Sequence, residues 1–203
     1  MIRIENAEVL GWEAAIRGMR NPKNSWDQID SDFRTEEIRL GEKDLRLARM
    51  LANAGNDHGK FLRMITVYVD LTAPLYWWKE FDTYKVGTVA DSCSTMHKIH
   101  AKEFTIEDFS CEHLNEDSKK VLHAVIGALN AHRDAFNQGH NKEEWWQMIQ
   151  LLPSSYDQRR TVMMNYAVLR NMYHSRRNHK LDEWRHLCEW MESLPYSELI
   201  IGE

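Results

Sequence analysis

The sequence predicts a soluble globular protein that combines long helices with a few strands. Its 203 residues are 43% hydrophobic and 28% charged, a balance typical of a chain that buries one sizeable core. Apolar residues recur at helical spacing over several long stretches. Two other stretches, residues 1–9 and 60–70, alternate in part, and the second is rich in β-branched and aromatic residues. We therefore expect one domain over residues 1–203.

The elements expected in the first half follow the periodicity of the apolar residues. They are a strand at 1–9, a helix at 12–20, a helix at 42–54, a central strand at 60–70 and a short helix from 74 onward. Gly55 is placed to end the second helix, because glycine readily adopts the left-handed conformation past a helix C-terminus. Proline is favoured in the first turn of a helix, so Pro74 is expected to open the next one.

The second half is expected to be mostly helical. Helices are predicted at 118–137, at 142–152, after Pro153 and at 182–194. Asn141 and Glu144 have the spacing of a capping box. Pro153 cannot continue a helix, and Ser155 or Asp157 can cap the next one. The apolar stripe of that next helix would comprise Val162, Tyr166, Leu169 and Tyr173.

Charge, cysteine content and hydropathy exclude several classes of protein. A net charge of -5 argues against general nucleic-acid binding but allows a local pocket for a phosphorylated small molecule. Cys93, Cys111 and Cys188 lack metal-ligand spacing, so we expect a reduced, cytoplasmic chain without a metal site. No stretch approaches the roughly 20 apolar residues of a membrane span.

The densest basic cluster of the chain follows Pro153. Its members are Arg159, Arg160, Arg170, Arg176 and Arg177. One interpretation is a solvated helix end, where cations gain about 0.3–1 kcal/mol from the exposed carbonyls. The other is an anion site, because guanidinium groups match phosphate oxygens or the carbonyl edge of a pyrimidine with paired hydrogen bonds. Charge alone leaves both interpretations open.

The residues around this cluster resemble the C-terminal signature of the flavin-dependent thymidylate synthases. The pattern consists of Leu152-Pro153, Asn165, Asn171, Arg176 and Trp184, in that order. In that family the asparagines contact the flavin, and the arginine holds and polarises the uracil of dUMP. The resemblance implies that Asn165 and Asn171 bind the cofactor. It also implies that Arg176 binds and activates the substrate.

The resemblance continues toward the N-terminus with departures. His58 stands where the family has a histidine near the flavin. Thr83-Tyr84-Lys85 stands where the family has Arg-His-Arg, the motif that gathers the flavin phosphates, so Tyr84 and Lys85 become the cofactor-binding candidates. Thr83 and Lys85 replace two arginines of that motif, which removes two fork-shaped guanidinium donors. Each charge-assisted hydrogen bond lost in this way is worth about 1.5–3 kcal/mol. The basic run His97, Lys98, His100 and Lys102 either takes over the phosphates or is a solvated loop.

Three further residues are substrate candidates by the same resemblance. Glu80 stands where relatives have an amide that orients the substrate. A glutamate accepts hydrogen bonds, so a base that offers an amine, such as cytosine, is a possible shift in substrate. Ser92 and Ser94 echo a family segment whose serine lies close to the uracil. Ser94 is accordingly a catalytic candidate beside Arg176, and Ser92 a substrate-binding one.

The resemblance implies an α+β fold with a mixed or antiparallel sheet flanked by long helices. It further implies a homotetramer whose active sites lie between subunits. The implied reaction is a reductive methylation, a one-carbon transfer to C5 of a pyrimidine deoxynucleotide such as dUMP. FAD would be the cofactor, with NADPH and methylenetetrahydrofolate as co-reactants. Two alternatives stay open: a non-catalytic nucleotide-binding protein that has lost flavin chemistry, and a purely structural or protein-binding role.

Overall fold

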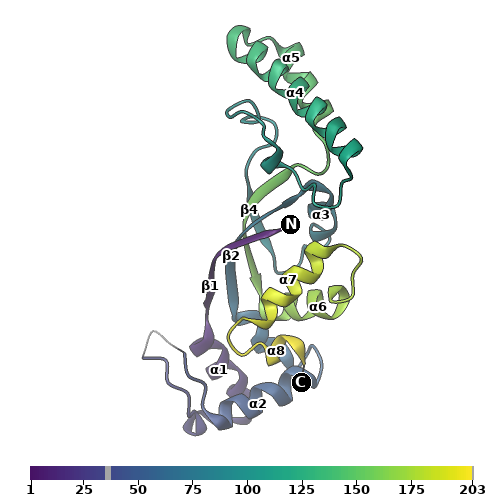
Figure 1. The fold of residues 1–203 in the computed structure, drawn as a ribbon. Coiled ribbons are helices and arrows are strands. Elements are labelled where there is room, and N and C mark those ends of the chain that lie inside the picture. Colours follow the sequence, from purple (N-terminus) through teal and green to yellow (C-terminus); the bar gives the residue numbers. More distant parts are fainter. Residues whose placement is uncertain (35–37, 203) are drawn as a thin grey trace. The chain divides into compact units, whose positions relative to one another are not determined.

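The computed structural model of the chain describes residues 1–34 and 38–202 (Figure 1). These residues form two compact units, which are described separately. The first unit contains residues 1–3, 71–83 and 91–160, and the second contains the described residues among 4–34, 38–70, 84–90 and 161–202. The expectation of a single domain over residues 1–203 stays a prediction.

The fold class predicted from the sequence is confirmed. Helices accompany a four-stranded antiparallel sheet with the strand order β1-β2-β4-β3. The strands are β1 (Arg3–Leu10), β2 (Thr66–Pro74), β3 (Val89–Ser92) and β4 (Asp157–Asn165). Hydrogen bonds beyond both ends of the β2–β4 pair show its antiparallel register. In the first unit the Leu75 N–H donates to the Tyr156 carbonyl at 3.0 Å, and in the second the Tyr166 N–H donates to the Ile65 carbonyl at 3.0 Å.

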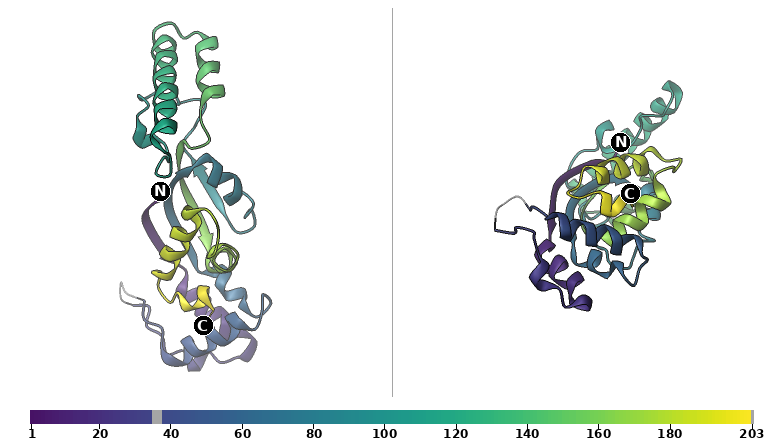
Figure 2. Two further views of the ribbon diagram at one scale, coloured as in Figure 1. Left: turned by 45° about the vertical axis from the view of Figure 1, so that its right-hand side comes forward. Right: turned by 90° about the horizontal axis from the view of Figure 1, so that it is seen from below.

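The first unit contains a helical hairpin, which both ribbon views show (Figure 2). Its helices are α4 (Glu116–Gly139) and α5 (Lys142–Leu151), and α3 (Leu75–Phe81) follows β2. The side chain of Asn115 caps α4, and that of Asn141 caps α5 by accepting the Glu143 N–H at 3.0 Å. The predicted helices at 118–137 and 142–152, and the Asn141 cap, are therefore confirmed.

The second unit contains five α-helices among its described residues. They are α1 (Trp12–Arg20), α2 (Glu42–Asn53), α6 (Tyr166–Arg176), α7 (Asp182–Glu192) and α8 (Glu198–Ile201). Helices α7 and α8 both pack against α6. Large apolar side chains, including Trp12, Leu169 and Trp184, are fully buried in this unit. The sequence predicted α1, α2 and α7 at their observed positions.

The helix predicted after Pro153 is wrong over residues 157–165, which form β4. Burial alternates along this strand, with Gln158, Val162 and Met164 buried. A period of two residues is the signature of a strand, and the arginines between the apolar positions conceal it. The helix α6 begins only at Tyr166.

The central strand predicted at 60–70 is displaced toward the C-terminus. Residues Gly59–Met64 form a 3₁₀ helix that buries Phe61 and Leu62, and β2 runs from Thr66 to Pro74. Pro74 is the last residue of the strand and precedes α3 with an extended conformation, ψ 150°. The predicted helix therefore exists, but proline stands before its first turn.

Candidate functional site

A pocket of about 600 Å³ opens in the second unit beside the start of α6. This volume is in the range of small-molecule and cofactor sites. Three segments line the pocket: residues 56–63 around the 3₁₀ helix, the loop at 86–87, and α6. The lining residues are Asn56, Arg63, Val86, Gly87, Asn165, Ala167, Val168, Arg170, Asn171 and His174.

The charge of this pocket, called the Asn165 pocket below, is positive. Arg63 and Arg170 line it, and no carboxylate does so among the described residues. Arg170 is held in place, because its Nη1 donates to the Leu199 carbonyl at 3.0 Å and its Nη2 to Asn53 Oδ1 at 2.9 Å. Arg63 is exposed and has no hydrogen bond or ion pair with any residue that the structure describes. The pocket thus offers one fixed and one adaptable guanidinium group to an anion.

Asn165 connects β4 to α6 and fixes the shape of the pocket. Its side chain is 8% exposed, and its Oδ1 accepts the Val168 N–H at 3.0 Å, so it is the N-cap of α6. The loop that carries Gly87 approaches this cap closely. A Cβ atom on Gly87 would lie 2.8 Å from Asn165 Nδ2, and the φ of 81° at Gly87 also favours glycine. The N-terminal end of α6, which favours anions, therefore borders the pocket.

Two more side chains of α6 face the pocket one turn further on. Asn171 and His174 are exposed and lie on the pocket side with Arg170. Partial burial, together with the positive charges of Arg170 and Arg177, lowers the pKa of His174 below its usual value. A neutral imidazole at pH 7 can accept a hydrogen bond as well as donate one.

Arg176, at the end of α6, is held by two aromatic side chains. Its Nε donates to the Tyr84 hydroxyl oxygen at 2.9 Å, and its Cζ lies 4.8 Å from the ring centroid of Trp184. The rings of Tyr84 and Trp184 meet edge to face, with centroids 5.9 Å apart. Arg176 is half-buried and is not among the described lining residues of the Asn165 pocket. Its partner Tyr84 begins the loop that reaches the pocket at Gly87.

Six of the predicted site residues belong to the second unit. Asn165 and Asn171 line one pocket, and Arg176 binds Tyr84. Lys85 is exposed in the loop between Tyr84 and the pocket. His58 is also exposed, and it precedes the 3₁₀ helix whose Arg63 lines the pocket. The roles assigned to these residues stay predictions.

The other three predicted residues belong to the first unit. Glu80 is half-buried near the end of α3, and Ser92 is the last residue of β3. Ser94 is exposed, and its Oγ accepts the N–H of His97 at 2.8 Å and that of Met96 at 3.2 Å. The run at 96–102 is a loop with most of its side chains exposed. The roles proposed for Glu80, Ser92 and Ser94 also stay predictions.

Sequence reasoning missed three polar lining residues and left a fourth without a role. Asn56, Arg63 and His174 were not expected at a site, and Arg170 was only a member of the basic cluster. Spacing was a usable signal for His174, which follows Arg170 by four residues and therefore shares its helix face. Arg63 had no such signal, because a strand was expected where a 3₁₀ helix forms.

The whole chain matches solved structures of one enzyme family. The fold is that of the flavin-dependent thymidylate synthases. Thymidylate Synthase X (ThyX) from Helicobacter pylori, in a crystal structure with FAD and dUMP, matches with a TM-score of 0.72 and 17% identity over 100% of this chain and 98% of that one. A second structure of ThyX from Helicobacter pylori, complexed with FAD and dUMP, matches with a TM-score of 0.72 and 16% identity, covering 99% and 98%. No protein-family model and no curated protein sequence matches the chain.

Two features are absent from residues 1–34 and 38–202. Over these ranges no helix is long and apolar enough to cross a membrane. Over the same ranges no group of three or more His, Cys, Asp or Glu side chains is placed to hold a metal ion.

Proposed function

We propose that the chain is a flavin-dependent, thymidylate synthase-like enzyme that acts on a pyrimidine deoxynucleotide such as dUMP. The observation that carries this proposal is the Asn165 pocket, in a chain whose fold matches ThyX over its whole length. Two arginines, three carboxamides and a helix N-terminus surround this pocket, and no carboxylate is among its described lining residues. Such a donor set suits a ligand that carries phosphate groups.

The residues present fit the phosphate-bearing part of a flavin. Arg63 and Arg170 would hold its phosphates, and Asn171 would donate to its polar edge. Gly87 leaves open the space that a side chain would fill beside Asn165. FAD, when bound, would supply the hydride and carry the one-carbon unit, with NADPH and methylenetetrahydrofolate as their sources.

The chain's own contribution would be position and charge. Arg176 would bind the carbonyl edge of the pyrimidine and draw electron density from the ring, so that C5 becomes nucleophilic without a side-chain nucleophile. Tyr84 and Trp184 would fix the direction of its guanidinium group and exclude water from one side of it. Ser94 would touch the base. We also propose a cytoplasmic homotetramer with active sites between subunits, which light scattering on the purified protein tests.

One observation favours the second candidate, a nucleotide-binding protein without flavin chemistry. Thr83-Tyr84-Lys85 stands where relatives have Arg-His-Arg, and Tyr84 uses its hydroxyl oxygen to accept from Arg176. Lys85 alone offers a cation in this triplet. A chain of this kind would bind dUMP through Arg176 and would bind FAD weakly.

The experiment that separates the two candidates is a pair of titrations with FAD and dUMP. Visible absorbance reports bound flavin, and thermal shift reports both ligands. The enzyme hypothesis expects saturable FAD binding that falls about 10-fold or more in Arg63→Gln. It expects dUMP binding to fall similarly in Arg176→Ala, and dTMP to form when NADPH and methylenetetrahydrofolate are added.

The matched control for both variants is Arg49→Gln. Arg49 is an exposed arginine of the same unit that pairs with Glu198 at 2.9 Å and does not line the pocket. Binding of dUMP without FAD would replace the enzyme hypothesis by the second candidate. Binding of neither ligand would reject both.

A further inference from the structure

A second basic pocket lies elsewhere in the second unit, between α1 and α2. It also has a volume of about 600 Å³, and the described residues that line it include none of those that line the Asn165 pocket. Four of its lining residues are cations: Arg20, Lys23, Lys43 and Arg46. Ser25 and Gln28 add polar groups, and Leu47 and Met50 form an apolar wall. Among the described residues, no carboxylate lines it.

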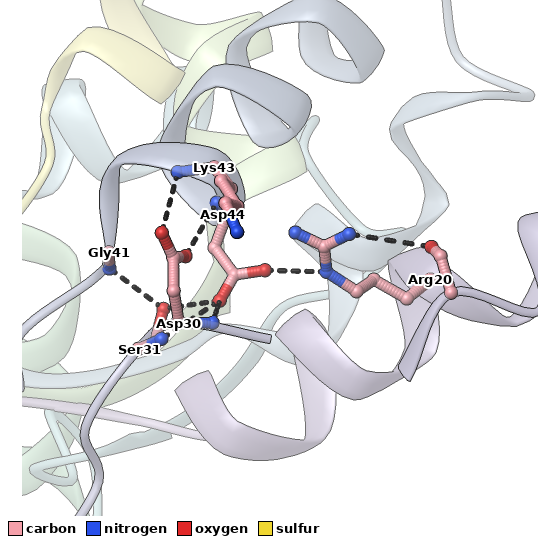
Figure 3. A network of polar contacts seen from close by, with 7 residues as sticks. Arg20, Asp30, Ser31, Gly41, Lys43 and Asp44 are labelled. Atoms are coloured by element: carbon pink, nitrogen blue, oxygen red, sulfur yellow. Dashed lines mark hydrogen bonds and ion pairs between the residues drawn. The ribbon is translucent and has the colours of Figure 1, made fainter. Parts of the chain in front are cut away.

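The most informative residue of this pocket is Arg20, which is only 3% exposed. Its Nε donates to Asp44 Oδ1 at 2.6 Å, and its Nη1 donates to Ser25 Oγ at 3.4 Å (Figure 3). Its Nη2 has no hydrogen-bond partner among the residues that the structure describes. Buried polar groups are nearly always paired, so this unpaired nitrogen of a residue that lines the pocket is a donor that a ligand can satisfy.

The buried ion pair between Arg20 and Asp44 leaves the pocket positive. Asp44 accepts three further hydrogen bonds at its Oδ2, from the Asp30 N–H at 3.0 Å, the Ser31 N–H at 3.0 Å and the Ser31 hydroxyl at 2.7 Å (Figure 3). These bonds lie away from Arg20 and fix the carboxylate. The carboxylate in turn fixes the guanidinium plane, which reduces the entropy lost when a ligand binds.

We propose that this pocket, called the Arg20 pocket below, binds the phosphate or pyrophosphate group of a small molecule. Arg20 is its fixed donor, and Lys23, Lys43 and Arg46 are exposed cations that also line it. A phosphate group pairs with several of these donors at once. The apolar wall of Leu47 and Met50 accommodates the rest of the molecule, and the volume suits a nucleotide or a sugar phosphate.

The alternative is that the three exposed cations are merely solvated. That interpretation accounts for Lys23, Lys43 and Arg46, because isolated surface charges contribute little. It does not account for Arg20, which is removed from water with one nitrogen unpaired. It also does not account for four cations around one pocket in a chain of net charge -5.

Calorimetric titration of the full-length chain with pyrophosphate and with inorganic phosphate tests the proposal. The test variant is Lys43→Gln/Arg46→Gln, which removes two exposed cations of the Arg20 pocket and leaves the buried pair intact. The matched control is Arg49→Gln/Lys60→Gln, which removes two exposed cations outside the pocket. Arg63→Gln separates this site from the Asn165 pocket.

The expected result is saturable pyrophosphate binding that weakens about 10-fold or more in Lys43→Gln/Arg46→Gln. Binding should persist in Arg49→Gln/Lys60→Gln, and one of two sites should persist in Arg63→Gln. Arg20→Lys, which keeps the charge but removes Nη2, should weaken binding as well. The proposal is overturned if no saturable binding occurs, if Lys43→Gln/Arg46→Gln binds like the parent chain, or if Arg63→Gln abolishes all binding.

Discussion

The Arg20 pocket and the Asn165 pocket hold their arginines in different ways. Arg20 is buried and fixed by a carboxylate, so its charge is already compensated inside the protein. Arg170, which lines the Asn165 pocket, is fixed by neutral oxygens, a carbonyl and a carboxamide, so its charge remains available to a ligand. The difference indicates that the Arg20–Asp44 pair stabilises the fold as well as fixing a donor of the Arg20 pocket, whereas Arg170 contributes mainly to binding.

The largest expected effect comes from breaking the buried pair. Asp44→Ala leaves the Arg20 guanidinium group buried without its counter-charge, which costs about 3–5 kcal/mol of unfolding free energy. Urea denaturation measures the change. The control is Glu13→Ala, which removes an exposed partner of Arg17 and should change stability by about 0.5 kcal/mol or less. Similar losses in both variants would show that Arg20 is not part of the folding core.

The next effect tests the backbone of the Asn165 pocket. Gly87→Ala places a Cβ atom 2.8 Å from Asn165 Nδ2 at a φ of 81°, so we expect a loss of about 1–3 kcal/mol. The matched substitution is Gly127→Ala in α4, where no described atom lies within 4 Å of the added Cβ. There we expect a gain of about 0.5–1 kcal/mol. Thermal unfolding should therefore shift in opposite directions, and equal shifts would contradict the close approach of the loop to the helix cap.

Much of the fold follows from local signals in the sequence. The cap at Asn141 and the apolar faces of α1, α2, α4 and α7 all act within a few residues. Strand β4 was missed because its identity depends on pairing with β2, which is distant in sequence. Its two adjacent arginines and its methionines carry little β-propensity of their own.

The candidate site was predictable only where its residues lie close together along the chain. Asn165, Asn171 and Arg176 share α6 or its cap, so a single stretch of sequence that resembles the signature of the flavin-dependent thymidylate synthases contains all three. Arg63 reaches the pocket from a 3₁₀ helix about a hundred residues earlier, and only the tertiary fold joins it to α6. The loop from Tyr84 to Gly87 connects Arg176 to the pocket. Residue spacing does not reveal this connection, because it depends on Gly87, whose lack of a side chain permits the close approach to Asn165.

A smaller effect tests how Arg176 is held. Tyr84→Phe keeps the ring beside Trp184 but removes the oxygen that accepts from Arg176 Nε, so we expect a loss of about 0.5–1.5 kcal/mol. Affinity for dUMP should fall more than stability does, because the hydrogen bond to Tyr84 contributes to the direction of the Arg176 guanidinium group. Tyr68→Phe, at an exposed tyrosine of β2, is the control and should leave both quantities unchanged. A Tyr84→Phe protein that binds dUMP like the parent would show that the phenol does not orient Arg176.

The smallest effect is a pH dependence that belongs to the Asn165 pocket alone. The pKa of His174 is lowered by partial burial and by Arg170 and Arg177, so the side chain gains its proton only below the usual histidine range. Protonation then adds a third cation to the pocket, and affinity for an anion rises as the pH falls from 7 to 5.

Sulfate is the suitable probe, because it keeps one charge state over this interval. The pH dependence of sulfate binding at this site should disappear in His174→Gln. It should persist in His186→Gln, because His186 is an exposed histidine of α7 outside the pocket. If the pH dependence of sulfate binding is unchanged in His174→Gln, the titrating group is not His174. The positive charge of the Asn165 pocket then comes from its arginines only.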